Sequence, residues 1–593
     1  MKTFFFLLIP IIVLIRLGFP PFDLAPATIA GWAILLSYIQ PERRSSFYAL
    51  GGAWLAGFIW NLSMTYYVAY PHWATSIGWV ALSMYLALYW VVWAWGCRLA
   101  SSRSVPLWIV APALWTGLEL LQGHLLSGFL LNQQAIIFYK APILLQVCEF
   151  AGSYAVSFVI ILIAALIYQI WDKSVKNQIS FGTVLLLALV LTAYAGSGFW
   201  LLEQANNKLS ANDSSSLKDD FSLVTGLDPD EFNVALIRGN EPCTVEYNPQ
   251  SVEDTFKNYR NLTFLALHNS PRPNAVVWPE GIFRYPRMAI GEVEPEPDET
   301  SFQGTKEEYL NTIQNRIKEF QPQIGIWGKT FDVNFITGVD RLVFSGKDVM
   351  RYNSVVGVDS LGHDAGQYDK RHLVLFGEYI PFADQFPILK QISPIGGGMQ
   401  AGKTAAVPLS FYKDDSPKAA SAAKNQGAEN DNSSWNFLPS VCYENTLPHV
   451  IRTQVLESTK PIDALLNLSN DGWFKGCYEN ELRFAQGVFR AIETRKNHLF
   501  VSNGGRSAII APTGSIIQSG EKGTLQPWGR TVKSEVIVAK LKKNGYRDVI
   551  TTYVQFGDVF ALFCLIYSVI TLFILLLQPT KSLNPVKEDR KIE

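Results

Sequence analysis

Apolar residues crowd into two parts of the chain, and a mixed polar and apolar sequence fills the part between them. Residues 1–203 and 556–578 contain long apolar runs, whereas residues 204–555 have the pattern of a water-exposed domain. A helix needs about 20 mostly apolar residues to cross a bilayer. The predicted membrane-spanning helices are 24–40, 47–70, 76–98, 105–123, 149–172, 180–202, 556–578 and a shorter one at 3–18.

The first apolar segment admits two interpretations. Lys2 precedes an apolar run, which is also the pattern of a cleaved signal peptide. No small-x-small cleavage site follows, because the chain continues as FPPFDLAP into the next apolar segment. We therefore count 3–18 as a membrane helix. The segment 124–148 is ambiguous, with a pattern that also fits a piece dipping into the edge of the bilayer.

Basic residues are unevenly distributed over the loops between these segments. The positive-inside rule places loops rich in Lys and Arg in the cytoplasm. With the N-terminus inside, the outer loop near 70–75 carries no basic residue, and Lys140 is the exception. The rule therefore places residues 204–555 outside the cytoplasm and the tail 579–593 inside. The basic residues of the inner loops are Arg43, Arg44, Arg98, Arg103, Lys173 and Lys176.

The middle of the chain alternates between short β-like runs and helical patterns. Helical spacing of apolar residues occurs at 252–267, 307–320 and 480–496. Strands that alternate with helices indicate a layered α/β domain. Polar residues 204–231 are predicted to be a linker, and the Ala-, Ser- and Asn-rich segment 413–435 a surface insertion. The β-like runs are 232–239, 274–281, 323–330, 352–360, 437–444, 463–470, 498–505, 507–514 and 534–541.

Composition and motifs exclude several classes of function. The formal net charge of −1 gives no reason to expect a nucleic-acid partner. GGMQAGKT at 397–404 matches the phosphate-binding loop pattern, but AAVPLSFY follows it instead of a helix. There is no H-E-x-x-H or G-x-S-x-G motif, and histidine and cysteine do not cluster at zinc-binding spacing. We therefore expect no cofactor and no metal.

Cysteine can serve as apolar filler, as half of a disulfide or as a nucleophile. Three cysteines lie in the predicted outer domain, where an oxidising compartment permits disulfides. Because three is odd, at least one thiol stays free unless it pairs with another molecule. Spacing alone leaves open whether Cys243 and Cys477 form a disulfide.

Three motifs contain side chains that together suit acyl transfer. VVWPEG places Glu280 after an apolar run, YDKRHLVLFGEYIP contains Lys370 and Glu378, and SVCYEN places Cys442 after another apolar run. A carboxylate can take the proton of a thiol, and an ammonium can stabilise the oxyanion that forms when sulfur attacks a carbonyl. The structural alternatives are a buried cysteine, a turn carboxylate and a surface ion pair.

At these motifs the chain resembles the nitrilase superfamily and, within it, the apolipoprotein N-acyltransferase family. The similar stretches are WPEG, YDKRHLVLFGEYIPF, VCYEN and NLSNDGWF, and seven apolar segments before the domain and one after it fit the same plan. The resemblance implies a polytopic α-helical membrane domain of about eight helices. It also implies an extracytoplasmic α/β nitrilase-like αββα sandwich at 232–545, preceded by membrane helices in 1–203 and followed by one at 556–578.

The resemblance also assigns roles to residues of this chain. Glu280 matches the general base, Lys370 the oxyanion-stabilising lysine and Cys442 the nucleophile that becomes a thioester. The remaining matches are Glu378, Tyr443 and Glu444 as supporting residues and Trp473 and Asn353 as substrate-binding residues. Three features depart from the family's pattern, namely Arg238 where a glutamine is expected, Cys477 and the long insertion at 413–435.

The activity implied is transfer of an acyl chain from a membrane phospholipid to the α-amino group of the diacylglyceryl-cysteine that begins an apolipoprotein. The implied partners are these two substrates and the bilayer, with no nucleic acid, and the chain is expected to be a monomer. The implied location is the bacterial inner membrane, with the catalytic domain on the periplasmic side. Two alternatives remain: a membrane-tethered nitrilase-type amidase, and a non-catalytic membrane scaffold or transporter.

Overall fold

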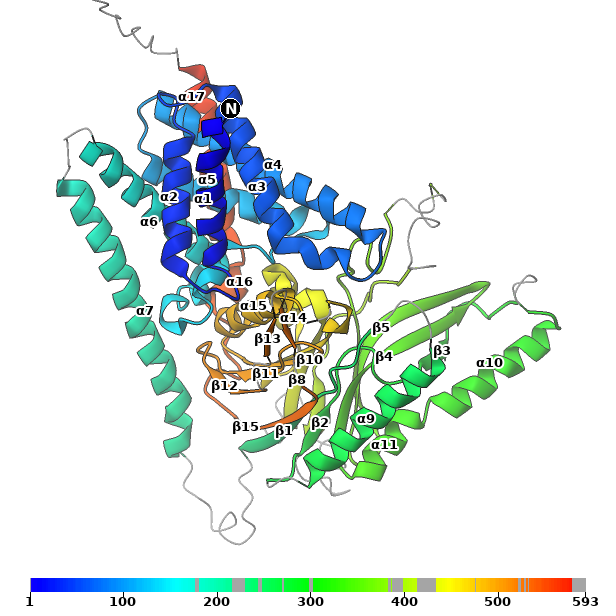
Figure 1. Cartoon of the computed structure of the whole chain (residues 1–593). Helices are drawn as coiled ribbons and strands as arrows, with labels where there is room; N and C mark the ends of the chain where they lie inside the picture. The colour runs from blue at the N-terminus through cyan, green and yellow to red at the C-terminus, as the bar shows by residue number, and fades with distance from the viewer. Residues whose placement is uncertain are drawn as a thin grey trace, which may run out of the picture.

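The computed structural model describes an apolar helical bundle joined to a two-sheet domain. In Figure 1 the bundle lies above the sheets, and the C-terminal helix runs back through the bundle. The described residues are 2–175, 181–215, 230–243, 248–268, 271–297, 302–381, 385–386, 398–412, 434–474, 476–520, 524–526, 529–531 and 533–578. The tail 579–593 and most of the predicted insertion, 413–433, therefore lie outside the described residues.

Each of the eight predicted apolar segments contains a helix. Four helices, α4, α6, α7 and α17, are long and apolar enough to cross a membrane, among the residues searched. The other four are shorter or less apolar, so the full count of membrane-spanning helices stays a prediction. The helices are α1 (Lys2–Leu17), α2 (Ala25–Tyr38), α3 (Ser46–Thr65), α4 (Thr75–Ser102), α5 (Leu107–His124), α6 (Cys148–Val175), α7 (Phe181–Ser215) and α17 (Val559–Leu577).

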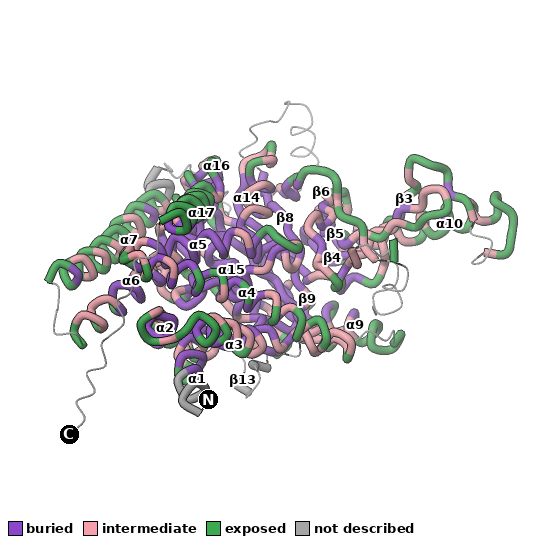
Figure 2. The backbone as a smooth tube through the Cα atoms, turned by 90° about the horizontal axis from the view of Figure 1, so that it is seen from above, coloured by how far each residue is buried: buried purple, intermediate pink, exposed green. Residues whose placement is uncertain are grey.

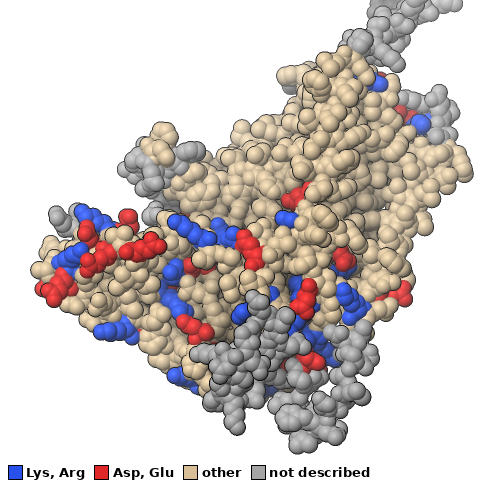
Figure 3. Space-filling model, turned by 180° about the vertical axis from the view of Figure 1, so that it is seen from behind, with Lys and Arg blue, Asp and Glu red and all other residues tan. Residues whose placement is uncertain are grey.

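The outer surface of the bundle is apolar. Phe181 and Phe199 on α7 and Phe563 and Phe573 on α17 are exposed, and in Figure 2 these helices carry long stretches of exposed residues. Figure 3 shows a broad surface almost free of charged side chains above a region where both signs of charge are mixed. Large exposed apolar surfaces mark contact with a membrane or another apolar partner, so these surfaces indicate an association with lipid.

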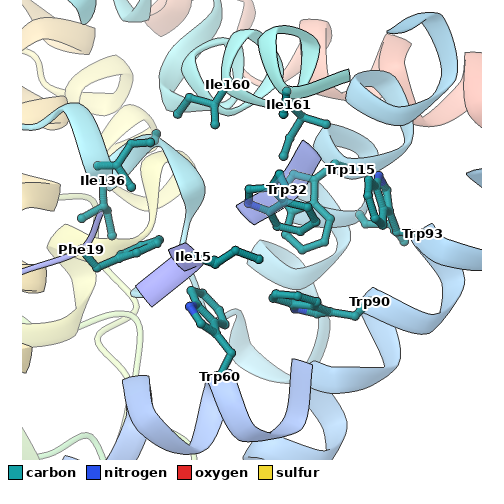
Figure 4. Packing of buried hydrophobic residues seen from close by; sticks show 14 of the residues in the cluster. Ile15, Phe19, Trp32, Trp60, Trp90, Trp93, Trp115, Ile136, Ile160 and Ile161 are labelled. Atoms are coloured by element: carbon teal, nitrogen blue, oxygen red, sulfur yellow. The ribbon is translucent and has the colours of Figure 1, made fainter. Parts of the chain in front are cut away.

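Tryptophans fill the interior of the bundle (Figure 4). Trp32 of α2 stacks on Trp90 of α4 with 4.9 Å between ring centroids, and its edge meets Trp115 of α5 at 4.4 Å. The indole N–H of Trp32 donates to Oε1 of Gln134, which satisfies its polar group inside the apolar core. Each aromatic pair contributes about 0.5–1.5 kcal/mol beyond the burial of its area.

The ambiguous segment 124–148 forms no continuous helix. It contains three short 3-10 helices, η2 (Leu125–Ser127), η3 (Gln134–Phe138) and η4 (Pro142–Leu144), joined by turns. Its middle part, around Leu130–Ile137, is buried between the bundle and the two-sheet domain. The segment therefore forms part of the junction between the two regions.

Two sheets form the core of the second region. The seven-stranded sheet has the order β15-β1-β2-β4-β5-β6, with β3 also paired to β4, and the six-stranded sheet has the order β12-β11-β10-β9-β8-β7. The strands of the first sheet are β1 (Glu231–Arg238), β2 (Ala275–Val277), β3 (Arg287–Ile290), β4 (Asn334–Ser345), β5 (Asp348–Val358), β6 (Asp364–Asp369) and β15 (Glu535–Lys542). Those of the second are β7 (Leu409–Tyr412), β8 (Ser434–Val441), β9 (Ala464–Asn470), β10 (Asn497–Asn503), β11 (Ala508–Ile510) and β12 (Ile516–Ser519), and β13 (Thr524–Gln526) pairs with β14 (Gly529–Thr531).

Helices cover both outer faces of the paired sheets. One hydrophobic cluster combines residues of both sheets, including Val277, Phe437 and Leu466, so the sheets pack face to face. Helices α9 (Pro249–Leu267) and α11 (Gln323–Phe331) pack on the first sheet, and α10 (Lys306–Phe320) packs against β3. Helices α14 (Pro448–Glu457) and α15 (Glu479–Thr494) lie on the side of the second sheet, and the short α16 (Thr552–Phe556) leads into α17. The order of layers is therefore helix, sheet, sheet, helix, as the resemblance implies.

Two expectations about local structure are wrong. Residues 323–330, predicted to be a strand, belong to α11, because Ile324, Gly328 and Phe331 recur at helical spacing and bury one face. The predicted linker begins too early, because α7 continues to Ser215 before β1 starts at Glu231. A short apolar run with glycines carries too little periodicity to separate helix from strand.

Helix α15 joins the bundle to the sheets. All of its residues except Glu481 are buried, and its apolar side chains share one hydrophobic cluster with the bundle. Polar contacts reinforce the junction: Gln486 donates to the carbonyl of Leu130 at 2.8 Å, and Arg495 pairs with Glu149 of α6 at 2.7 Å. The carboxylate of Glu493 accepts the backbone N–H of Ser153 at 2.9 Å. The two-sheet domain is thus seated on the bundle through a polar helix that is almost completely buried.

Candidate active site

Cys442 lies on a sharp turn at the end of β8. The strand ends at Val441, and the 3-10 helix η5 (Cys442–Thr446) begins at once. Cys442 has a φ of +56°, a left-handed conformation that non-glycine residues rarely adopt. Such strain is found where the surrounding structure fixes a residue for function. The turn holds the sulfur beyond the carboxyl end of the strand.

Glu280 follows β2 in the other sheet. Its Oε1 accepts from the amide of Asn353 at 2.6 Å, and its Oε2 accepts the backbone N–H of Asn470 at 2.9 Å. The backbone of β4 passes close by, because a Cβ on Gly338 would lie 2.6 Å from the Cα of Glu280. Both sheets therefore contribute to the position of this carboxylate.

Lys370 lies at the end of β6, where its ammonium is completely buried. It donates to Oε1 of Glu378 at 2.7 Å, and the other oxygen of Glu378 accepts the backbone N–H of Val374 at 2.9 Å. The amide of Asn353 also lies 3.4 Å from Glu378, so it sits between the two carboxylates. The structure brings together the four charged and thiol groups singled out in the sequence, since each of Glu280, Lys370 and Glu378 interacts electrostatically with Cys442.

Burial and charge set the protonation states of this site. Burial raises the pKa of the Cys442 thiol to about 12, against the opposing effect of Arg483 and Lys370. Burial also raises the pKa of Glu280, which the positive charge of Lys370 partly offsets. Burial disfavours the charge of Lys370, but Glu378, Cys442 and Glu280 outweigh it and raise its pKa. The resting site therefore holds a protonated thiol, a charged lysine and a carboxylate whose pKa is raised by burial.

Glu444 connects the turn of Cys442 to the segment that follows Lys370. Its Oε2 accepts the backbone N–H of Val441 at 2.7 Å. Its Oε1 accepts the backbone N–H groups of Arg371 and His372 at 2.8 and 3.0 Å and the hydroxyl of Tyr368 at 2.7 Å. One fully buried carboxylate thus fixes the spacing between the thiol and the ammonium.

Tyr443 and Trp473 lie on the two turns at the carboxyl ends of β8 and β9. The hydroxyl of Tyr443 donates to the carbonyl of Gly128 at 2.8 Å, so the residue after Cys442 touches the junction segment below the bundle. Trp473 is half-buried in η6 (Asp471–Phe474), directly after β9. The candidate site therefore faces the ends of the apolar helices.

Arg483 is a part of the site that reasoning from sequence motifs misses. Its guanidinium donates to Sγ of Cys442 at 3.0 Å and to the hydroxyl of Ser469 at 2.6 Å, and it pairs with Asp471 and Glu479. The side chain is 2% exposed. The motif around 480–496 predicts a helix with a polar face, but only the packing of α15 turns that face towards the thiol.

Replacing Arg483 by glutamine is expected to make the Cys442 thiol less acidic. The cation favours the thiolate, so its removal raises the pKa of the thiol and slows alkylation at a fixed pH. The rate should fall about tenfold if the pKa of the thiol rises by about one. The measurement is the rate of alkylation of Cys442 against pH. Arg490→Gln is the matched control, because Arg490 is a buried arginine of the same helix that pairs with Glu493. An unchanged profile for Arg483→Gln contradicts the role.

The cysteines of the two-sheet domain are reduced. Cys243 and Cys477 are both free, so the disulfide left open by their spacing does not form. Sγ of Cys243 donates to Oδ1 of Asn470 at 3.1 Å, and Cys477 is buried. Cys442 therefore has no disulfide partner either.

Comparisons of the sequence with known proteins relate the chain to a family. Residues 13–166 match the apolipoprotein N-acyltransferase N-terminal domain, and residues 324–550 match the carbon-nitrogen hydrolase family. The apolipoprotein N-acyltransferase of Rhodopirellula baltica is 26% identical over 92% of this chain and 92% of its own length. The chain belongs to the apolipoprotein N-acyltransferase family. With its carbon-nitrogen hydrolase domain, it is an N-acyltransferase enzyme.

Other comparisons agree with membership of the apolipoprotein N-acyltransferase family. The apolipoprotein N-acyltransferase of Geobacter metallireducens is 27% identical over 85% of this chain and 84% of its own length. Among solved structures, an amidase from Nesterenkonia sp. matches 55% of this chain and 95% of its own, with 11% identity and a TM-score of 0.34. This match carries no assignment of family or function.

Proposed function

We propose that this chain transfers an acyl chain from a membrane phospholipid, through a thioester on Cys442, to the α-amino group of the diacylglyceryl-cysteine of an apolipoprotein. The observation that carries the proposal is the convergence of Cys442, Glu280 and Lys370 in one partly buried site that faces the apolar bundle. Membership of the family supports the same reaction.

The first half of the proposed reaction forms the thioester. Glu280 takes the proton of the Cys442 thiol while sulfur attacks the ester carbonyl carbon of the phospholipid. The carbonyl oxygen becomes an oxyanion, which Lys370 stabilises. When the C–O bond breaks, the lysophospholipid leaves with the proton that Glu280 held. A preorganised cation at the oxyanion is typically worth a factor of about 10²–10³ in rate.

The second half uses an amine in place of water. The free α-amino group attacks the thioester carbonyl, Glu280 takes its proton, and collapse of the oxyanion forms the amide and returns a protonated thiol. Each buried CH₂ group of a lipid chain gains about 0.8 kcal/mol, so both substrates stay in the bilayer. A site at the end of the bundle meets them there.

The proposal also covers the residues around the reacting groups and the placement of the chain in the membrane. Glu378, Tyr443 and Glu444 position the reacting groups, and Trp473 and Asn353 contact substrate. The chain acts as a monomer in the bacterial inner membrane, with eight membrane-spanning helices and its two-sheet domain, 232–545, on the periplasmic side. The uneven distribution of basic residues over the loops supports this orientation.

Mass spectrometry of the Cys442 peptide tests the proposal. The protein is incubated in vesicles with a phospholipid that carries a labelled acyl chain, and we expect a labelled acyl thioester on Cys442. Addition of a peptide that begins with diacylglyceryl-cysteine should discharge the thioester and form a labelled amide. The same peptide with an acetylated amine is the control. Release of free fatty acid at the same rate with both peptides would indicate a hydrolase instead.

Thioester formation is expected to slow at acid pH. Glu280 has to be deprotonated to take the thiol proton, and burial together with Glu378 raises its pKa, against Lys370, Asn353 and Arg483. The acid limb of the rate profile should therefore have its midpoint above the ordinary glutamate pKa of about 4.3. The measurement is lysophospholipid release in a single turnover as a function of pH, and a midpoint at or below that value contradicts the assignment.

A further inference from the structure

Three side chains that the acyl transfer does not use converge where the two-sheet domain meets the bundle. His124 is the last residue of α5, Asp558 immediately precedes α17, and His449 lies in the first turn of α14. One potential metal-ligating atom from each lies within 4.8 Å of the other two. The cluster exists only because two bundle helices and the domain come together, so spacing along the chain could not reveal it.

The imidazole of His124 is oriented by its own helix. Its Nδ1 donates to the carbonyl of Leu120 at 2.9 Å, which leaves the lone pair on Nε2. That nitrogen lies 3.7 Å from Oδ2 of Asp558. Two ligands of a tetrahedral zinc ion, at bond lengths of about 2.0–2.1 Å, are about 3.4 Å apart. The pair therefore needs only a small inward movement to share an ion.

The other two groups are also prepared to act as ligands. The hydroxyl of Tyr553 donates to Oδ1 of Asp558 at 2.6 Å, and such outer contacts orient metal-binding carboxylates. The ring of His449 stacks on that of His124 at 4.3 Å, and its buried Nδ1 has no hydrogen-bond partner within the described part of the chain.

We propose that His124, His449 and Asp558 bind one Zn²⁺ ion, with water in the fourth position. Two imidazoles and a carboxylate form a ligand set that zinc takes in proteins, and imidazole favours zinc over magnesium or calcium. The side chain of His124 is 44% exposed, so an ion has a route to the site.

The ion would fasten the catalytic turn to the bundle. Helix α14 begins two residues after η5, the turn that carries Cys442. His372, close to Lys370 in sequence, has its ring 6.3 Å from that of His449. An ion that joins α14 to α5 and α17 therefore holds this part of the domain at a fixed distance from the lipid-facing helices. The proposed role is structural, and it does not depend on which acyl acceptor the enzyme uses.

Zinc content tests the proposal directly. The full-length protein in detergent is treated with a chelator, titrated with Zn²⁺, desalted and analysed for metal, and we expect about one zinc per chain. His124→Gln and His449→Gln should each lose the bound zinc. Tyr553→Phe should weaken binding by about tenfold, as loss of an outer contact does in other zinc sites. His268→Gln is the matched control, because His268 is an exposed histidine at the end of α9.

Two results would overturn the site. The first is a wild-type protein that retains no zinc after exposure to micromolar concentrations. The second is zinc binding that survives both His124→Gln and Asp558→Asn, which would assign the ion to cysteine thiols or other groups. Because the His124 side chain is partly exposed, His124→Gln decides the outcome even where His449→Gln impairs folding.

Discussion

Replacement of Cys442 by alanine is expected to abolish acyl transfer. The thioester cannot form without the sulfur, and loss of a catalytic nucleophile typically lowers the rate by about 10³-fold or more. The buried site keeps its fold, because alanine fits the space of a cysteine and the turn is held by Glu444. The measurement is N-acylation of a diacylglyceryl-cysteine peptide in vesicles, with the Cys442 peptide followed by mass spectrometry.

A second cysteine provides the control for that experiment. Cys564 is buried in α17, away from the candidate site, so Cys564→Ala should retain both activity and thioester. Full N-acylation activity of the Cys442→Ala protein would refute covalent catalysis through this thiol. Loss of activity in both variants, with loss of the folded protein, would point to a packing defect instead.

Lys370→Met is expected to lower the turnover rate by about 10²–10³-fold, with a smaller effect on substrate binding. In the proposed mechanism the ammonium faces charge that develops only when the carbonyl is attacked, so its loss is expected to act on the transition state. It also leaves Glu378 and Glu280 without their buried countercharge, which raises the pKa of Glu280 further. The measurement is the single-turnover rate of thioester formation, compared with the affinity for phospholipid vesicles.

Lys403→Met is the matched control for the lysine. Lys403 is exposed and belongs to the stretch 397–404 that matches a phosphate-binding pattern in sequence. It should leave thioester formation unchanged. A Lys370→Met enzyme that forms the thioester at the wild-type rate would remove the ammonium from the mechanism and leave the backbone and Arg483 as the remaining groups able to face the oxyanion.

The apolar helices, and the positions after strands where two side chains of the candidate site lie, could be predicted because both leave local signals. A run of about 20 apolar residues indicates by itself a helix long enough to cross a bilayer. Each predicted segment contains a helix. Glu280 and Cys442 each follow an apolar run, and the carboxyl ends of parallel strands gather side chains at one edge. Local patterns therefore locate the ends of β2 and β8, which carry Glu280 and Cys442 into the same site.

Other parts of the fold depend on contacts between distant segments. Strand β4 is absent from the predicted β-like runs, because Asp340 and Arg341 disturb the alternation of a strand and their partners, Arg351 and Asp369, lie on other strands. Arg483 looks like an ordinary charged residue on a helical face. Its approach to the thiol follows from the burial of α15 between two layers, which no pattern within 480–496 reports.

The contact that Glu444 makes with the segments of Cys442 and Lys370 has a consequence for how the proposed site could admit a lipid chain. Because the Glu444 carboxylate accepts hydrogen bonds from the backbone of both Val441 and Arg371, we expect the segments that carry the thiol and the ammonium to move together. Entry of a bulky tail therefore has to be accommodated by other parts of the protein, while the reacting centre moves as a single block. If the segment around Val441 or the segment around Arg371 is replaced by that of a distant relative, we expect activity to be retained only when both segments are replaced together.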